Sequence, residues 1–362
     1  MVLAAALGAA LVGSCQQDRL ARILPPGVRV DVFPQVSRAQ LDTLFVVDNA
    51  DHIAPDQQKV ADSFGLFLDY LDQNQIDYHV GIVTTDLTPE LHGQAPQYQG
   101  GGSSHYFAAG DANLRANLTA TIVGLGDKGS ALEAALQQLD LSLKAPPPGF
   151  LRDGAALFLV AVTDDDDPWS PNNGTTDTAS PDYDLYYVRA FRQAKGAGND
   201  GLVTFSVIAG DLPNGCSIPD PLNPSSTFFA DPANRLTALA HKLGGVTHSI
   251  CDPSFDAVFR ELGASAAGLK RAFRLAQVPD LATLVVSVRA PCDALPAALT
   301  ACTQTSNECT SAQPALVCTP RMAAQDGWQY DASTNSIIFN GASVPPRASI
   351  VEVQYAAKGG AQ

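Results

Sequence analysis

Hydrophobic and polar positions follow two different periods along the first two thirds of the chain. Short runs of apolar and β-branched residues predict strands at 43–47, 78–86, 155–163, 203–210 and 246–250. The segments between them place apolar residues at helical spacing and predict helices at 55–73, 130–141, 231–245 and 252–269. This alternation predicts an α/β fold, in which a doubly wound, Rossmann-like and mostly parallel sheet carries helices on both faces.

The start of the helix at 130–141 is predicted from a capping box. Ser130 precedes Glu133 by three positions, a spacing at which each side chain accepts a hydrogen bond from the other residue's backbone N–H. A helix that begins at Ser130 places Leu132, Leu136 and Leu139 on one face.

Three of the predicted strands end at an aspartate. Asp48 and Asp164 directly follow buried-looking strands, and Asp86 closes the strand at 78–86. Ligands of open α/β sheets bind outside the carboxyl ends of the strands. We therefore expect these three carboxylates to lie at one functional edge of the sheet.

The pattern changes near residue 272, where short strands are divided by proline, asparagine and glycine. We interpret residues 272–358 as a small β domain. Its core is modest, so disulfides are expected to stabilise it.

Cysteines support this division of the chain. Apart from Cys15, the chain has six cysteines, and an even number in an exported protein indicates disulfides. We predict a bond between Cys216 and Cys251. For the other four we favour nested pairing, one of three possible arrangements, with Cys292–Cys318 around Cys302–Cys309.

The N-terminal sequence MVLAAALGAALVGSC indicates export. It is too short for a membrane-spanning helix and is typical of a signal-peptide apolar region. Its end, LVGSC, resembles a bacterial lipobox, which implies that Cys15 is lipidated. Gln16 at the next position then favours the outer membrane, and an ordinary cleaved signal peptide is the alternative. Residues 16–40 are polar and predict a tether.

Composition narrows the function classes. The net charge is −15 and the isoelectric point is about 4.6, so the surface repels phosphate backbones and a general nucleic-acid role is excluded. The sequence contains no GxSxG, HExxH or P-loop motif, and no strand is followed by GxGxxG. We therefore predict a protein that is not an enzyme.

The segment TLFVVDNADHI, the amphipathic helix after it, YHVGIVTTD and LFLVAVTDDDD together resemble a von Willebrand factor A-type domain over residues 41–268. The form is closest to that of δ-proteobacterial, including myxobacterial, lipoproteins. The resemblance implies a metal-ion-dependent adhesion site, where a cation bound by Asp-x-Ser-x-Ser, a threonine and a further aspartate takes a partner's carboxylate.

The match to that site is partial. Asp48 occupies the leading aspartate position, but Ala50 and His52 stand where the two serines belong. Ser130 is the hydroxyl nearest the threonine position, and Asp164 or Asp165 supplies the last aspartate. The resemblance therefore implies a degenerate site with Asp48, Asp164 and Asp165 as candidate metal ligands and Ser130 as a further one.

Three interpretations of DNADHI stay open. The segment is a strand-to-helix turn in which Asp48 bonds nearby backbone groups. Alternatively, Asp48, Asp51 and the acids at 164–167 bind Ca²⁺ or Mg²⁺ in a rearranged site. In the third, His52 and carboxylates bind a softer ion such as zinc.

These observations lead to one expected function and two alternatives. We expect a lipid-anchored envelope protein that requires no cofactor and binds a protein partner through the edge loops. The candidate contact residues are Asn49, Asp51, His52, Asp86 and Trp169. The alternatives are a metal-dependent hydrolase that uses Asp48, Asp86 and Asp164, and a structural envelope module.

Overall fold

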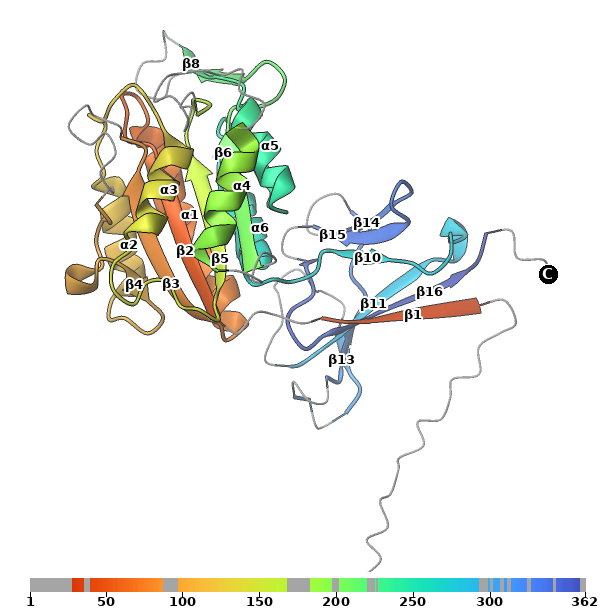
Figure 1. Cartoon of the computed structure of the whole chain (residues 1–362). Coiled ribbons are helices and arrows are strands. Elements are labelled where there is room, and N and C mark those ends of the chain that lie inside the picture. The colour runs from red at the N-terminus through yellow and green to blue at the C-terminus, as the bar shows by residue number, and fades with distance from the viewer. Residues whose placement is uncertain are drawn as a thin grey trace, which may run out of the picture.

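A computed structural model describes residues 28–35, 40–86, 97–167, 183–196, 202–219, 225, 227–292, 299, 302–306, 309–310, 314–323, 327–340 and 343–358. Their strands and helices form an α/β unit and a β unit (Figure 1). None of the helices in these ranges combines the length and the apolar character needed to cross a membrane.

The α/β unit is built on a mostly parallel sheet. In spatial order its described strands are β4 (Phe107–Ala108), β3 (Asp77–Thr84), β2 (Gln40–Val47), β5 (Ala156–Val162), β6 (Val203–Ala209) and β9 (Thr247–Ser249). Neighbours from β3 to β9 run parallel, whereas the short β4 is antiparallel to β3. The α/β class and the parallel sheet predicted from the sequence are confirmed.

Helices cover both faces of this sheet (Figure 1). One face carries α1 (Ala54–Gln73), α2 (Leu114–Val123) and α6 (Asp256–Ala266), and the other carries α3 (Ala135–Lys144), α4 (Tyr183–Ala194) and α5 (Asn234–Lys242). Successive residues of β2 point to opposite faces, so Phe45 joins the first core and Leu44 the second. Burial on both sides explains why the central strands are continuously apolar.

Helix α3 begins five residues later than the capping box predicts. Its N-cap is Ala134, and the predicted first turn is a loop instead. Ser130 forms a local turn, because its Oγ accepts a hydrogen bond from the Leu132 N–H at 3.1 Å. Glu133 does not cap the helix because its carboxylate accepts a hydrogen bond from the Thr163 hydroxyl.

The β unit contains two described sheets. The larger has the order β1 (Val28–Pro34), β16 (Ile350–Ala356), β11 (Val285–Ala290), β13 (Leu316–Cys318) and β12 (Cys302–Gln304). The smaller has the order β10 (Ala272–Arg274), β15 (Ser336–Phe339) and β14 (Trp328–Asp331). The short helices η2 (Gly102–Ser104) and η4 (Leu281–Thr283) lie in loops.

Strand β1 corrects the tether prediction. It lies within the range 16–40 and pairs antiparallel with β16, from Val28 opposite Ala356 to Pro34 opposite Ile350. Residues 28–34 are therefore part of the β unit, because the last strand supplies the hydrogen-bonding edge that they need. The α/β unit is consequently an insertion between β1 and β10 (Figure 1).

The two connections between the units meet at Gln35, whose side chain is buried. Its Nε2 donates to the carbonyls of Lys270 and Pro345, each at 2.9 Å, and its Oε1 accepts from the Lys270 N–H at 3.0 Å. Nearby, Arg347 donates to the Asn74 carbonyl at 3.0 Å and to the Gln75 side chain at 2.6 Å. Gln35 therefore ties the two connecting segments to the β unit, and Arg347 joins the β unit to the end of α1.

One of the three disulfide bonds was predicted correctly from the sequence. Cys216 is bonded to Cys251, as predicted. The nested pairing of the other four is wrong, because the bonds are Cys292–Cys309 and Cys302–Cys318. Strands β12 and β13 place Cys302 directly opposite Cys318, with 4.1 Å between their Cα atoms. This pairing brings the two sulfurs within bonding distance, so Cys302 is not available to Cys309.

Candidate functional site

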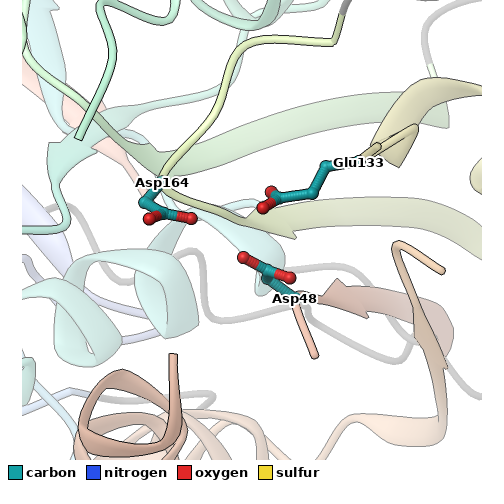
Figure 2. Close-up of side chains that lie close together, drawn as sticks. All are labelled: Asp48, Glu133 and Asp164. Atoms are coloured by element: carbon teal, nitrogen blue, oxygen red, sulfur yellow. The ribbon is translucent and has the colours of Figure 1, made fainter. Parts of the chain in front are cut away.

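Three carboxylates from separate loops converge at the carboxyl edge of the parallel sheet. Asp48 follows β2, Asp164 follows β5, and Glu133 lies just before α3. Figure 2 shows the three side chains pointing toward one another. One oxygen from each lies within 4.8 Å of the others, a spacing that one divalent cation can span.

Asp48 is held at the centre of this cluster. It is 0% exposed, and its Oδ1 accepts hydrogen bonds from the Ala50 N–H at 2.7 Å and the Thr85 hydroxyl at 3.1 Å. Gln57 fixes the backbone beside it by donating to the Asp48 carbonyl at 2.7 Å. The other carboxylate oxygen of Asp48, Oδ2, is buried and has no hydrogen-bond partner among the described residues. An unpaired buried carboxylate oxygen is costly, so it points to a missing ligand.

Glu133 is placed by the loop that replaces the predicted helix turn. It is 5% exposed, and its backbone forms an isolated antiparallel bridge with Asp86. This loop packs closely on the loop after β2: Gly129 donates to the Asn49 carbonyl at 2.7 Å, and a Cβ at Gly129 would lie 2.5 Å from Asn49 Oδ1. The glycine therefore permits the approach that brings Glu133 to Asp48.

Electrostatics disfavours three charges here without a counter-ion. Burial, followed by repulsion from Asp48 and Asp164, raises the pKa of Glu133 well above its usual range. Burial and the neighbouring Asp48 also raise the pKa of Asp164. The cluster therefore holds protons at neutral pH unless a cation replaces them.

The four aspartates at 164–167 have separate environments. Asp166 accepts hydrogen bonds from the Arg235 and Leu236 N–H groups at the start of α5, the nearest at 2.9 Å. Asp167 accepts from the Leu136 N–H in the first turn of α3 at 2.6 Å. Asp165 lies beside Asp164 and Asp231, and burial and these acids raise its pKa to about 6. Asp164 alone joins the three-carboxylate cluster.

Other candidate ligands lie outside the cluster. Asp86 Oδ1 accepts a hydrogen bond from the Ser130 N–H at 3.1 Å, so both residues support the Glu133 loop. Among described acids, histidines and cysteines, the residues close enough to share an ion are Asp48, Glu133 and Asp164. The sequence prediction thus named two of the three and missed Glu133.

The side chains that follow Asp48 face solvent. Asp51 and His52 are exposed, with 3.3 Å between Asp51 Oδ2 and His52 Nε2. The backbone of His52 has a left-handed φ of 74°. His52 is therefore part of the turn and is absent from the described acidic cluster, which leaves the zinc interpretation without its nitrogen ligand. Asn49 is partly buried against Gly129. Trp169 and Cys15 lie outside the described residues.

An apolar cavity lies between α1 and a hairpin that the sequence did not predict. Strands β7 (Cys216–Pro219) and β8 (Thr227–Ala230) form the hairpin, which the Cys216–Cys251 bond ties to the end of β9. The cavity measures about 310 Å³ and is lined by His52, Pro55, Asp56, Lys59, Ile218, Phe228 and Pro253. The hairpin ends beside the acidic cluster, because the Asp231 N–H donates to the Asp164 carbonyl at 2.8 Å.

Comparisons with known proteins leave the family unassigned. No family model and no curated protein matches the chain. Similar solved structures include proximal thread matrix protein 1 of the mussel byssus, with a TM-score of 0.38 and 11% identity over 68% of this chain and 51% of that one. The human coat protein Sec24c has a TM-score of 0.37 and 10% identity over 92% and 42%.

A third similar structure is the pilus adhesin SpaC of Lactobacillus rhamnosus GG, with a TM-score of 0.35 and 12% identity over 91% of this chain and 41% of that one. The chain thus spans about half or less of the length of each of these proteins. The TM-scores are below 0.5, so these similarities carry no conclusion about function.

The donor set fits a hard divalent cation. Carboxylate oxygens are the ligands that Ca²⁺, Mg²⁺ and Mn²⁺ prefer. Asp48, whose buried Oδ2 has no hydrogen-bond partner among the described residues, supplies one of these carboxylates. One bound ion would satisfy that oxygen and offset the repulsion between the three carboxylates.

Proposed function

We propose that this chain is a non-enzymatic recognition protein of the bacterial cell envelope, with a divalent cation bound by Asp48, Glu133 and Asp164. One observation carries the proposal: Asp48, which is fully buried and has one carboxylate oxygen without a hydrogen-bond partner among the described residues, lies with two other carboxylates at the carboxyl edge of a parallel sheet. That edge is where open α/β sheets bind ligands.

We further propose that residues 41–268 form a von Willebrand factor A-type domain. The parallel strand order, the helices on both faces and the acids after β2 and β5 support this assignment. Glu133 comes from the loop in which the resemblance expects a threonine. In this proposal a carboxylate has replaced that hydroxyl and compensates for Ala50 and His52.

A bound Ca²⁺, Mg²⁺ or Mn²⁺ would act as the counter-ion for the negative charges of the three carboxylates. The residues of this chain position the oxygens: Thr85 holds Asp48, and Thr163 holds Glu133. The backbone of Asp164 is held by the hairpin through the Asp231 N–H. Removal of a single hydroxyl should therefore loosen one ligand without removing it.

Apolar groups around this edge support a protein partner. Phe229 on β8 is 53% exposed, and Leu212 in the loop before β7 is 45% exposed. Phe229 follows the cavity-lining Phe228 on β8, whereas Leu212 lines a second cavity of about 280 Å³ between the end of β6 and α5. Exposed aromatic and aliphatic groups next to a partly apolar cavity are typical of a surface that contacts protein.

Recognition is favoured over hydrolysis by the positions of the acids. The hydrolase alternative needs Asp86 beside Asp48 and Asp164, whereas the Asp86 carboxylate accepts a hydrogen bond from the Ser130 N–H. Two of the three clustered carboxylates are buried, which restricts the approach of a substrate. The export and lipid-anchor proposal depends on the N-terminal sequence and Cys15.

Calorimetric titration of the metal-stripped chain with Ca²⁺, Mg²⁺, Mn²⁺ and Zn²⁺ tests the cation site. We expect saturable binding of the hard cations that is lost in Asp164→Asn, because this change removes one charged ligand while preserving the side-chain shape. Asp165→Asn is the matched control and should bind as the native chain does. Equal loss in both variants, or no binding by the native chain, would refute the site.

Partner recognition needs a separate test. Envelope proteins captured by the native chain should be compared with those captured by Phe229→Ser and by Val123→Ser. Both positions are exposed and apolar, but Val123 lies at the end of α2, away from the hairpin. We expect a partner that is lost only with Phe229→Ser. Capture that is insensitive to Phe229 would contradict recognition at this edge.

A further inference from the structure

The charge of the acidic cluster limits what a bound cation can do. Once a cation has replaced the protons of the cluster, the three ionised carboxylates carry a formal charge of −3, so a divalent cation leaves the site at −1. The described ion pairs give none of these three residues a lysine or arginine partner. A loaded site therefore stays negative and repels a further carboxylate.

Burial adds to this effect. Asp48 and Glu133 are 0% and 5% exposed, and Asp164 is only partly exposed. Charges in such surroundings are screened less by water and salt than charges on an open surface. Solvent therefore weakens the repulsion between a loaded site and an acidic group on a partner less than it would on an open surface.

The origin of the ligands indicates a different role for the ion. Asp48, Glu133 and Asp164 belong to three loops that are separate in sequence, and their carboxylates would repel one another if all three were ionised without an ion. The same loops carry the groups that surround the partner surface: His52 follows Asp48, and the hairpin is hydrogen-bonded to Asp164. An ion shared by all three would fix that surface.

We propose that the cation organises the loops of the edge and does not bridge to a carboxylate of the partner, and that Glu133 determines this behaviour. This inference rests on the proposed function, because it requires cation binding at the cluster. The partner is then recognised by neutral, apolar or basic groups that contact the loop surface. Glu133→Thr would leave two carboxylates, and the loaded site would be neutral and able to accept an anion.

Manganese and acetate provide the test. Metal-stripped full-length chain is loaded with Mn²⁺, and the relaxation rate of water protons reports the water molecules bound to the ion. Acetate in excess is then added as a carboxylate probe. We expect no change in the native chain and a fall in the relaxation enhancement in Glu133→Thr, because acetate displaces water only from the neutral site.

The affinity for Mn²⁺ gives a second readout. It should weaken by roughly tenfold or more in Glu133→Thr, since affinity follows the charge of the ligands. Glu133→Gln keeps the length of the side chain and should weaken binding similarly, which separates loss of charge from loss of fold. Thermal melts without metal should show both variants folded.

The outcomes distinguish the two proposals. Mn²⁺ binding with displacement of water by acetate in the native chain would overturn the loop-organising role while leaving the cation site intact. Absence of saturable Mn²⁺ binding would overturn both. Unchanged affinity in both Glu133 variants would show that Glu133 is not a ligand and would also overturn the inference.

Discussion

At the scale of single residues, acids that are adjacent in the sequence have different structural roles. In the run 164–167, Asp164 faces two other carboxylates, whereas Asp166 and Asp167 accept backbone N–H groups from two different helices. Hydrogen bonds from helix N–H groups to at least two of its members help the chain to tolerate this run of like charges, although burial still raises the pKa of Asp166. Identity alone does not distinguish these roles.

His248 provides a prediction at this scale. Burial lowers the pKa of His248, and the nearby Glu261 and Asp252 oppose this shift while Arg271 adds to it. Below the ordinary pKa near 6.5, the unfolded chain then binds more protons than the folded chain. Stability should fall as the pH drops through this window, with a slope of at most about 1.4 kcal/mol per pH unit.

Denaturant unfolding of the native chain and His248→Gln between pH 7.5 and 5.5 measures this contribution, in steps of roughly half a pH unit. The native chain should lose more stability over the range, since glutamine does not titrate. His241→Gln is the control, because His241 is exposed on α5. Parallel curves for the native chain and His248→Gln would contradict the prediction.

The residues of the cluster were predictable only in part. Asp48 and Asp164 were found because each follows a continuously apolar strand, and the ends of parallel strands share an edge. Glu133 was missed because its spacing from Ser130 matches a capping box. The only signal for it was an acid in the loop where the resemblance expects a hydroxyl, and tertiary contact with Thr163 decided its position.

At the scale of elements, helix starts depend on groups from other parts of the chain. The N-cap residues of α3 and α5 are alanines, which cannot accept a side-chain hydrogen bond. Asp167 and Asp166, which lie beyond β5, accept the N–H groups of these helices instead. Local sequence rules cannot locate a helix start whose cap comes from so far away.

The cap of α5 can be tested by Asp166→Ala. This variant should lose about 1–2 kcal/mol of unfolding free energy, because two N–H groups at the start of α5 lose their acceptor. Asp165→Ala is the matched control and should be neutral or slightly stabilising, since the described hydrogen bonds join the α5 N–H groups to Asp166, whereas Asp165 lies beside Asp164 and Asp231. Midpoints in denaturant measure both effects. A loss in Asp165→Ala equal to that in Asp166→Ala would argue against the cap.

At the scale of the whole molecule, the two units do not follow one another along the chain, because the β unit contains both β1 and the strands from β10 to β16. Periodicity correctly predicted the α/β unit, because its strands and helices alternate along the sequence. It missed that β1 belongs to the β unit, since its partner β16 lies at the other end of the chain. The alternating sequence VRVDVF at 28–33 was the available signal for a strand, but the sequence does not indicate which strand it pairs with.

The connection between the units predicts a large effect for Gln35→Ala. This buried side chain serves two carbonyls and one N–H, and its loss leaves them unpaired. We expect a loss of about 3 kcal/mol of unfolding free energy. Gln40→Ala is the control, because Gln40 is exposed and should change stability by less than about 0.5 kcal/mol. Equal denaturation midpoints for Gln35→Ala and Gln40→Ala would show that the hydrogen bonds of Gln35 do not stabilise this connection.

The pairing of β1 with β16 has a consequence for synthesis of the protein. Val28 is synthesised long before its partner Ala356, because the whole α/β unit lies between them in the sequence. During that interval the inserted α/β unit can fold alone, but β1 keeps a free hydrogen-bonding edge. The first strand of the described residues is thus among the last to pair. Completion of the β unit has to wait for the synthesis of β16, and a holding chaperone would act at this stage.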